Sequence, residues 1–240
     1  MEVIKHMVEG VFALTKLDHE NILTFFGITT ELDGTVSLVS EWMAKGNAHE
    51  YVQNCDVDPE PLLLGVASGL QYLHGHIPHP IFHGALKGSN ILISPRGQAL
   101  LTDFGLLDLV DSPFLVAFID TINWTSPERL DDPKGSAAGD VWAFGMTALE
   151  LFTRAPPFGS IRGLAELERR IARGPPDRPN DETTCRRLTD GWWKICMLCW
   201  SQDPSLRLSI DEVLVMVEDE LLEALRRNRS KMRRMLMQYT

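Results

Sequence analysis

Two short polar segments near the middle of the chain limit its fold most strongly. The first is the eight-residue stretch from His83 to Asn90, and the second is Asp103-Phe104-Gly105, which begins thirteen residues after Asn90. The residues between them predict two short strands, Ile91–Ile93 and Ala99–Thr102, with a turn at 94–97. Any fold for this chain must therefore accommodate both polar segments next to this predicted pair of strands.

Further motifs flank these segments in a fixed order. One precedes them and three follow: Glu41-Trp42-Met43, then Ser126-Pro127-Glu128, then Asp140 to Gly145, then Cys199-Trp200 with Asp203-Pro204 and Arg207. Each motif alone is a weak signal, but all of them in this order and at these spacings form a strong one. Together they resemble the eukaryotic protein kinase family, and within it the tyrosine-kinase-like group most closely. The resemblance runs from about residue 2 to residue 224.

The resemblance implies an α+β fold with the two lobes of a protein kinase, and residues 1–56 are expected to form a partial N-lobe and hinge. Apolar residues at three- to four-residue spacing predict a helix over 2–17. The runs Ile22–Ile28 and Thr35–Ser40 predict two strands, which Asp33-Gly34 would join as a hairpin turn. The expected N-lobe is thus incomplete, with one helix and a two-strand hairpin.

The rest of the chain is expected to be mainly helical. Residues 59–74 read as a long helix with one apolar face, and from Asp140 onward helical patterns alternate with proline-marked loops. We therefore expect a kinase-like C-lobe over residues 57–224 and a basic C-terminal tail over residues 225–240.

The resemblance also assigns chemical roles. Asp103 would chelate magnesium, because a hard cation prefers carboxylate oxygen, and Asn90 would bind a second metal through its amide oxygen. Lys87 would steady the charge of the transferring phosphoryl group. Glu41 and Met43 would contact the nucleotide at the hinge. The implied cofactors are ATP and Mg²⁺.

A second set of residues has structural roles in the resemblance. Glu128 and Arg207 would form a buried ion pair that fixes the activation segment to the helical lobe. Asp140 would accept hydrogen bonds from the backbone of the catalytic loop, and His83 and Phe104 would stack between the lobes. Because these roles shape the fold, their presence says little about turnover.

The catalytic loop departs from the kinase pattern at one decisive position. The pattern His-x-Asp-x-x-x-x-Asn places the general base where this chain has Ala85. A methyl group accepts no proton, and loss of a general base costs roughly 10²–10⁴-fold in rate. The degenerate site therefore keeps Lys87 but lacks its base.

The start of the chain departs further. The 240 residues contain no Gly-x-Gly-x-x-Gly and no strand lysine, and Gly10 stands where a kinase helix carries the glutamate that pairs with that lysine. The sequence thus predicts an N-terminally truncated kinase domain, with ATP and Mg²⁺ binding that is weak or absent. Three accounts of the incomplete N-lobe stay open: it packs on the large lobe alone, a partner supplies the missing strands, or the chain belongs to a longer protein.

Two functions follow from this pattern. The first is a pseudokinase, a kinase-like domain that is catalytically impaired and acts as a binding or regulatory module. Its expected partner is a protein, with another kinase domain as one candidate. The alternative is an active protein kinase that phosphorylates Ser/Thr or Tyr, either in a longer form or by an atypical mechanism.

Charge and cysteine content bear on partners and location. The net charge is −10 although residues 225–240 carry six basic and no acidic side chains, and an acidic body does not favour nucleic acid. The tail could contact an acidic protein or an anionic membrane, fold back on the body, or remain solvated. Four cysteines without a disulfide pattern, and a start that lacks a secretory signal, predict a cytoplasmic protein.

Overall fold

Helix α5, Ala137–Thr153, forms the centre of the molecule. Every residue from Gly139 to Phe152 is buried, as expected for a helix that is apolar on all sides. Ser136 caps the start of the helix, where its side chain accepts a hydrogen bond from the Gly139 N–H. Arg154, in the left-handed conformation, caps its end. Its burial fixes the positions of the elements that carry the polar motifs.

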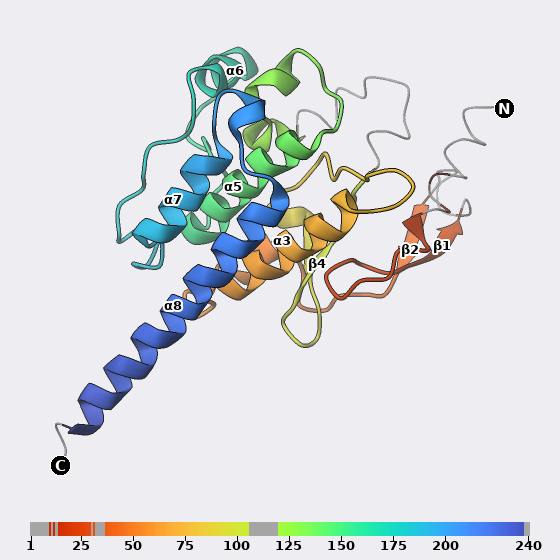
Figure 1. The fold of residues 1–240 in the computed structure, drawn as a ribbon. Helices are drawn as coiled ribbons and strands as arrows, with labels where there is room; N and C mark the ends of the chain where they lie inside the picture. The colour runs from red at the N-terminus through yellow and green to blue at the C-terminus, as the bar shows by residue number, and fades with distance from the viewer. Residues whose placement is uncertain are drawn as a thin grey trace.

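The computed structural model describes residues 10, 12, 14–29, 31, 37–105 and 120–237, with the side chains of 228 and 230–237 left aside. Its elements, drawn in Figure 1, are β1 Phe25–Thr29, β2 Ser37–Ser40, α2 Ala48–Tyr51, α3 Glu60–His74, η1 Gly88–Asn90, β3 Ile91–Ile93, β4 Ala99–Leu101, η3 Ile122–Trp124, η4 Pro127–Leu130, α5, α6 Leu164–Ala172, α7 Asp190–Cys199, η5 Pro204–Leu206 and α8 Ile210–Met237.

Four helices build the large lobe. Helix α3 packs against α5 and α8, and α7 packs against α5 and α8 as well. The fully buried side chains include Trp142 of α5 and Trp192 of α7, which supply much of the apolar area removed from water. The second half of α8 projects away from this lobe (Figure 1).

The strands form two antiparallel pairs. In the first, β1 pairs with β2 and the register shifts between Phe25 and Gly27, whose φ of 154° suits glycine. In the second, β3 pairs with β4, with Ile91 opposite Leu101. Bridges from Ile22 to Leu101 and from Asn47 to Leu92 tie the N-terminal segments to this second pair.

The predicted α+β fold, with few strands beside a helical lobe, is confirmed. The strand pairs appear as expected, with ends that differ by up to three residues, and the helix predicted over 59–74 spans Glu60–His74. Most of the helix predicted over 2–17, and the turn Asp33-Gly34, lie outside the described residues. The proposed domain limits stay predictions, although α8 runs without a break through residues 224 and 225.

Among the described residues, no helix is both long enough and apolar enough to cross a membrane.

Candidate functional site

Asp140 holds the catalytic-loop segment in shape. It lies in the first turn of α5 with 1% of its surface exposed, and its carboxylate accepts hydrogen bonds from the N–H groups of His83 (2.7 Å) and Gly84 (2.8 Å). His74 Nε2 lies 2.9 Å from the same carboxylate. Burial alone would raise the pKa of Asp140, but these donors outweigh it and lower the pKa. The loop backbone therefore binds a stable buried anion, as the sequence implies.

An aromatic column joins the loop to the small lobe. The His83 ring meets Phe104 at 6.3 Å between centroids, and Phe104 meets Phe25 of β1 at 5.9 Å. The planes of His83 and Phe104 differ by 79°, so the two rings pack edge to face. Burial lowers the pKa of His83 and keeps the ring neutral.

Hydrogen bonds join Asn90 to Ala85 and to the residue that precedes Asp103. The Asn90 side-chain amide nitrogen donates to the Ala85 carbonyl at 2.8 Å, and the Asn90 carbonyl accepts from the Thr102 N–H at 3.1 Å. Thr102 directly precedes Asp103, so this second bond links the backbone next to Asp103 to Asn90. Asp103 has a φ of 58°, an uncommon value for a non-glycine residue, and its side chain is exposed. The neighbouring Gly105 N–H donates to carbonyls of the catalytic loop.

Lys87 is buried and already paired. Its ammonium group forms an ion pair with the carboxylate of Asp120 and also donates to the Asp120 carbonyl at 3.3 Å. The ammonium lies 5.9 Å from the centre of the Trp124 ring. The lysine that the resemblance assigns to a phosphoryl group thus meets an internal carboxylate.

Glu128 and Arg207 form a two-pronged ion pair. Arg207 Nη1 and Nη2 donate to the two Glu128 oxygens at 2.6 and 2.7 Å. The arginine side chain is fully buried and the glutamate side chain is 32% exposed, so the pair is less buried than the sequence reading held. Burial opposes ionisation of Glu128, but the bonds from Arg207 and Ser126 lower its pKa overall.

The hinge motif lies in the segment after β2. Met43 is buried at 7% exposure, whereas Glu41 and Trp42 face solvent. The Met43 carbonyl accepts from the Gly46 N–H, and the Gly46 carbonyl accepts from Ile93. Backbone hydrogen bonds thus join this segment to β3, and among the described residues no hydrogen bond or ion pair joins it to Asn90 or Asp103.

The amino-acid sequence of this chain is similar to those of known proteins. Residues 2–217 match the family described as the protein kinase domain. The chain belongs to the eukaryotic protein kinase family. The kinase domain is 28% identical to mitogen-activated protein kinase kinase kinase 3 of Arabidopsis thaliana over 89% of this chain and 34% of that protein.

Other similar proteins include cytokinesis protein sepH of Emericella nidulans, 28% identical over 84% of this chain and 14% of that protein. A leucine-rich repeat receptor-like serine/threonine-protein kinase of Arabidopsis thaliana is 29% identical over 87% of this chain and 21% of its own length. The kinase domain thus spans about a third or less of the length of these relatives.

Kinase domains of this family generally use ATP and Mg²⁺. The donor chemistry fits such a metal, because Asp103 presents an exposed carboxylate. The amide nitrogen of Asn90 donates to Ala85, so the amide oxygen is the atom of this side chain that would bind a cation. Asp103 and the Asn90 amide oxygen would therefore be the ligands in this kinase domain. A bound metal would supply charge neutralisation for phosphate oxygens.

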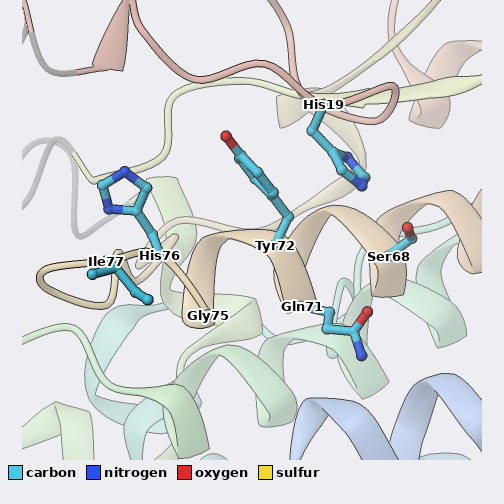
Figure 2. Close-up of a pocket in the computed structure, with 7 residues that line it drawn as sticks. All are labelled: His19, Ser68, Gln71, Tyr72, Gly75, His76 and Ile77. Atoms are coloured by element: carbon cyan, nitrogen blue, oxygen red, sulfur yellow. The ribbon is translucent and has the colours of Figure 1, made fainter.

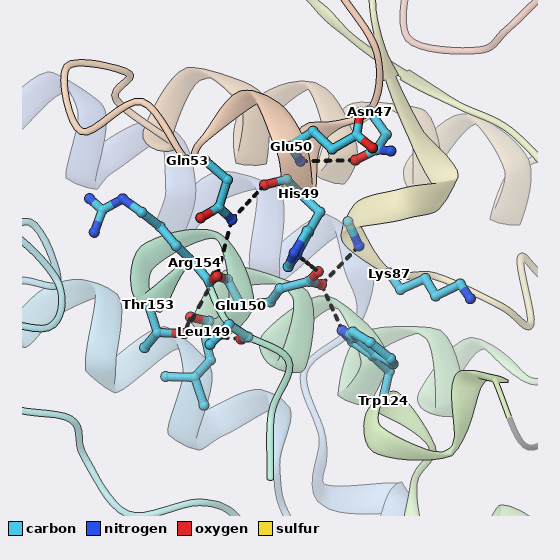
Figure 3. Close-up of polar contacts among 12 residues, drawn as sticks. Asn47, His49, Glu50, Gln53, Lys87, Trp124, Leu149, Glu150, Thr153 and Arg154 are labelled. Atoms are coloured by element: carbon cyan, nitrogen blue, oxygen red, sulfur yellow. Dashed lines mark hydrogen bonds and ion pairs between the residues drawn. The ribbon is translucent and has the colours of Figure 1, made fainter. Parts of the chain in front are cut away.

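Sequence reasoning missed Glu150, which connects four parts of the kinase domain (Figure 3). Its carboxylate, in a residue 2% exposed, accepts from the Gly88 N–H (2.8 Å) and Trp124 Nε1 (2.8 Å), and lies 2.7 Å from His49 Nδ1. A Cβ on Gly88 would approach Glu150 Oε1 to 2.6 Å, so glycine permits the close contact. The available signal was a carboxylate in the apolar second half of α5.

Sequence reasoning also missed Asp120, for which no motif gave a signal.

A cavity of about 460 Å³ lies elsewhere, beside α3 (Figure 2). His19 stacks on Tyr72 there at 4.8 Å between centroids, with His76 and Ile77 completing the wall. None of the predicted site residues lines this cavity.

Proposed function

We propose that this kinase domain is catalytically impaired and acts as a binding or regulatory module. The observation that carries the proposal is Ala85, a methyl group in the place of the base in a loop whose backbone is otherwise well held. Without a base the substrate hydroxyl is neither oriented nor deprotonated, and positioning is most of what catalyses phosphoryl transfer. A domain that keeps the kinase fold but lacks the base can still bind other molecules through its surface.

The Lys87–Asp120 ion pair supports the same proposal. In the resemblance, Lys87 stabilises charge on the phosphoryl group, but here its buried ammonium group contacts a carboxylate of the same chain. A phosphate group would have to displace Asp120 to reach it. The domain therefore carries two obstacles to transfer, one at residue 85 and one at residue 87.

We assign the domain to the tyrosine-kinase-like group, on the form His-Gly-x-Leu-Lys-Gly-x-Asn and on Cys199-Trp200 with the downstream Asp203-Pro204. We propose a protein partner, with another kinase domain as one candidate. The four free cysteines support placement in the reducing cytoplasm.

The decisive experiment measures ATP-dependent phosphorylation of the domain itself and of a generic acceptor. We expect no transfer above that of an Asp103→Ala control. The repaired Ala85→Asp variant tests whether the base is the main obstacle, and Ala85→Asp with Asp120→Ala tests whether the second obstacle adds to it. Transfer by the natural chain that Asp103→Ala abolishes would refute the proposal.

Nucleotide binding needs a separate measurement. We expect weak or no ATP binding, read as the shift in thermal unfolding midpoint at millimolar ATP with and without Mg²⁺ or Mn²⁺. A metal-dependent rise that Asp103→Ala removes would assign a functional nucleotide site to Asp103 and Asn90. The proposed regulatory role is compatible with that result, whereas the weak-binding part of the proposal is not.

The second candidate is an active kinase in a longer form or by an atypical mechanism. The presence of Lys87, Asn90 and Asp103 favours it, because the family resemblance gives all three a role in phosphoryl transfer. The two candidates separate in the same assay on the longest natural form of the protein. Transfer by that form, dependent on Asp103, would establish the second.

A further inference from the structure

Helix α8 carries an exposed stripe with coiled-coil spacing. Residues Val215, Glu218, Leu222, Leu225 and Arg229 follow one another at alternating intervals of three and four, and all are exposed. The three apolar members are 56%, 50% and 59% exposed. In the sequence the same spacing continues at positions 232 and 236, which are Met and Leu. An alternating interval of three and four is the pattern of a helix that pairs with another helix.

The stripe is separate from the face by which α8 joins the domain. Val213 and Val217 are fully buried, and α8 packs against α3 and α7. The second half of the helix projects away from the lobe (Figure 1). The described structure therefore gives the stripe no partner within the domain, while leaving room for another helix along it.

Charge is divided along the same helix. Residues 211–223 carry six acidic and no basic side chains, and residues 226–234 carry six basic and no acidic ones. Two such helices side by side in the same direction would juxtapose like charges. In opposite directions, each acidic half would face a basic half. Charge complementarity thus selects one orientation and one kind of occupant, a second copy of the chain.

We propose that two copies of this chain associate through an antiparallel pair of α8 helices. One register places the middle of the stripe against itself. In that register Leu222 meets Leu225 of the second copy, and Glu218 meets Arg229 of the second copy. The two leucine contacts lie in the middle, and an ion pair flanks them on either side.

Within one helix the same charges have a simpler role. Acidic residues near the start and basic residues near the end of a helix stabilise its dipole, and Glu223 pairs with Arg227 at 3.5 Å. That role explains the division of charge but not the exposed leucines. Glu218 and Arg229 lie eleven positions apart, about 16 Å along the helix at 1.5 Å per residue. A direct ion pair between them therefore requires two chains.

The test is the oligomeric state of the full chain, measured by sedimentation velocity over a concentration series. We expect a monomer–dimer equilibrium for the natural sequence. Glu218→Arg alone and Arg229→Glu alone each place like charges together at two symmetric contacts, so each is expected to weaken the dimer by at least about 100-fold. The double variant E218R/R229E restores opposite charges and is expected to bring dimerisation back to within about tenfold of the natural chain.

Arg227→Glu is the matched control. It makes the same charge change on the helix but off the stripe, and we expect dimerisation to persist. Circular dichroism on every variant checks that α8 remains folded. The proposal would be overturned if the natural chain stays monomeric at concentrations up to about 100 µM. It would also be overturned if the double variant fails to recover dimerisation. Monomers that instead bind phosphatidylserine vesicles, with binding lost in both R229E variants, would assign the helix to membranes and overturn it as well.

Discussion

At the scale of single residues, buried carboxylates make this domain sensitive to pH. The hydrogen bond to Glu150 raises the pKa of His49, with burial acting against it. A raised folded-state pKa means that the stabilisation is fully present below pH 6.5 and is lost as pH rises through the folded value. We expect the difference in unfolding free energy between the natural chain and His49→Gln to be larger at pH 6 than at pH 9. Denaturant titrations at both pH values measure it, and a constant difference would contradict it.

Glu60 gives a pH dependence in the same direction, but here the ionised form costs stability in the folded domain. It lies in the first turn of α3, where burial, with Asp58 nearby, raises its pKa to about 7 from an ordinary 4.5. The folded state then binds the proton more tightly, so stability falls as pH rises from 4.5 to 7 and the penalty is complete above that range. Glu60→Gln is therefore expected to stabilise the domain at pH 8 by roughly 1–3 kcal/mol and to have little effect at pH 4.5. Thermal unfolding across this range checks the trend, which equal midpoints at pH 8 would refute.

At the scale of elements, the Glu128–Arg207 pair joins η4 to the segment after η5. Arg207 also donates to the Ala138 carbonyl at the start of α5, so one guanidinium connects three elements. Lysine keeps the positive charge but cannot form the two parallel hydrogen bonds that the guanidinium makes with Glu128. We therefore expect Arg207→Lys to lower the free energy of unfolding by about 2–4 kcal/mol. Arg178→Lys is the control, because its partner Asp190 is exposed, and it should cost under about 1 kcal/mol. Equal losses in both variants would show that the buried fork adds nothing.

The same elements show what the sequence could and could not predict. The strands Ile91–Ile93 and Ala99–Leu101 were predictable because short β-branched or apolar runs flank a turn whose residues have strong local preferences. The bonds from Asp140 to the catalytic loop were predictable only through the family resemblance, since 56 and 57 residues separate the partners.

The Glu150 cluster had no such aid. Its donors come from His49, Gly88 and Trp124, which are 101, 62 and 26 residues away. No local spacing links residues this far apart, and only the folded chain brings them together. The same reason hid the pairing of Lys87 with Asp120, because a lysine in a recognised motif suggests a ligand more readily than an internal carboxylate.

At the scale of the whole molecule, order should be greatest around α5 and least around the small hairpin. Helix α5 is buried from Gly139 to Phe152, whereas β1 and β2 pair only with each other among the described residues and expose Phe26 and Val39. We expect amide hydrogens of α5 to exchange only by global unfolding and those of β1 and β2 to exchange orders of magnitude faster. Hydrogen exchange followed by mass spectrometry measures this gradient, and uniform protection across both regions would argue against it.

The way Asp140 holds the catalytic loop has a consequence for the history of the chain. Its carboxylate binds backbone N–H groups, so the shape of the loop does not depend on the side chain at position 85. Alanine and aspartate codons differ by a single nucleotide. An exchange between alanine and aspartate at position 85 is therefore expected to leave the shape of the loop intact, because its anchor is the backbone.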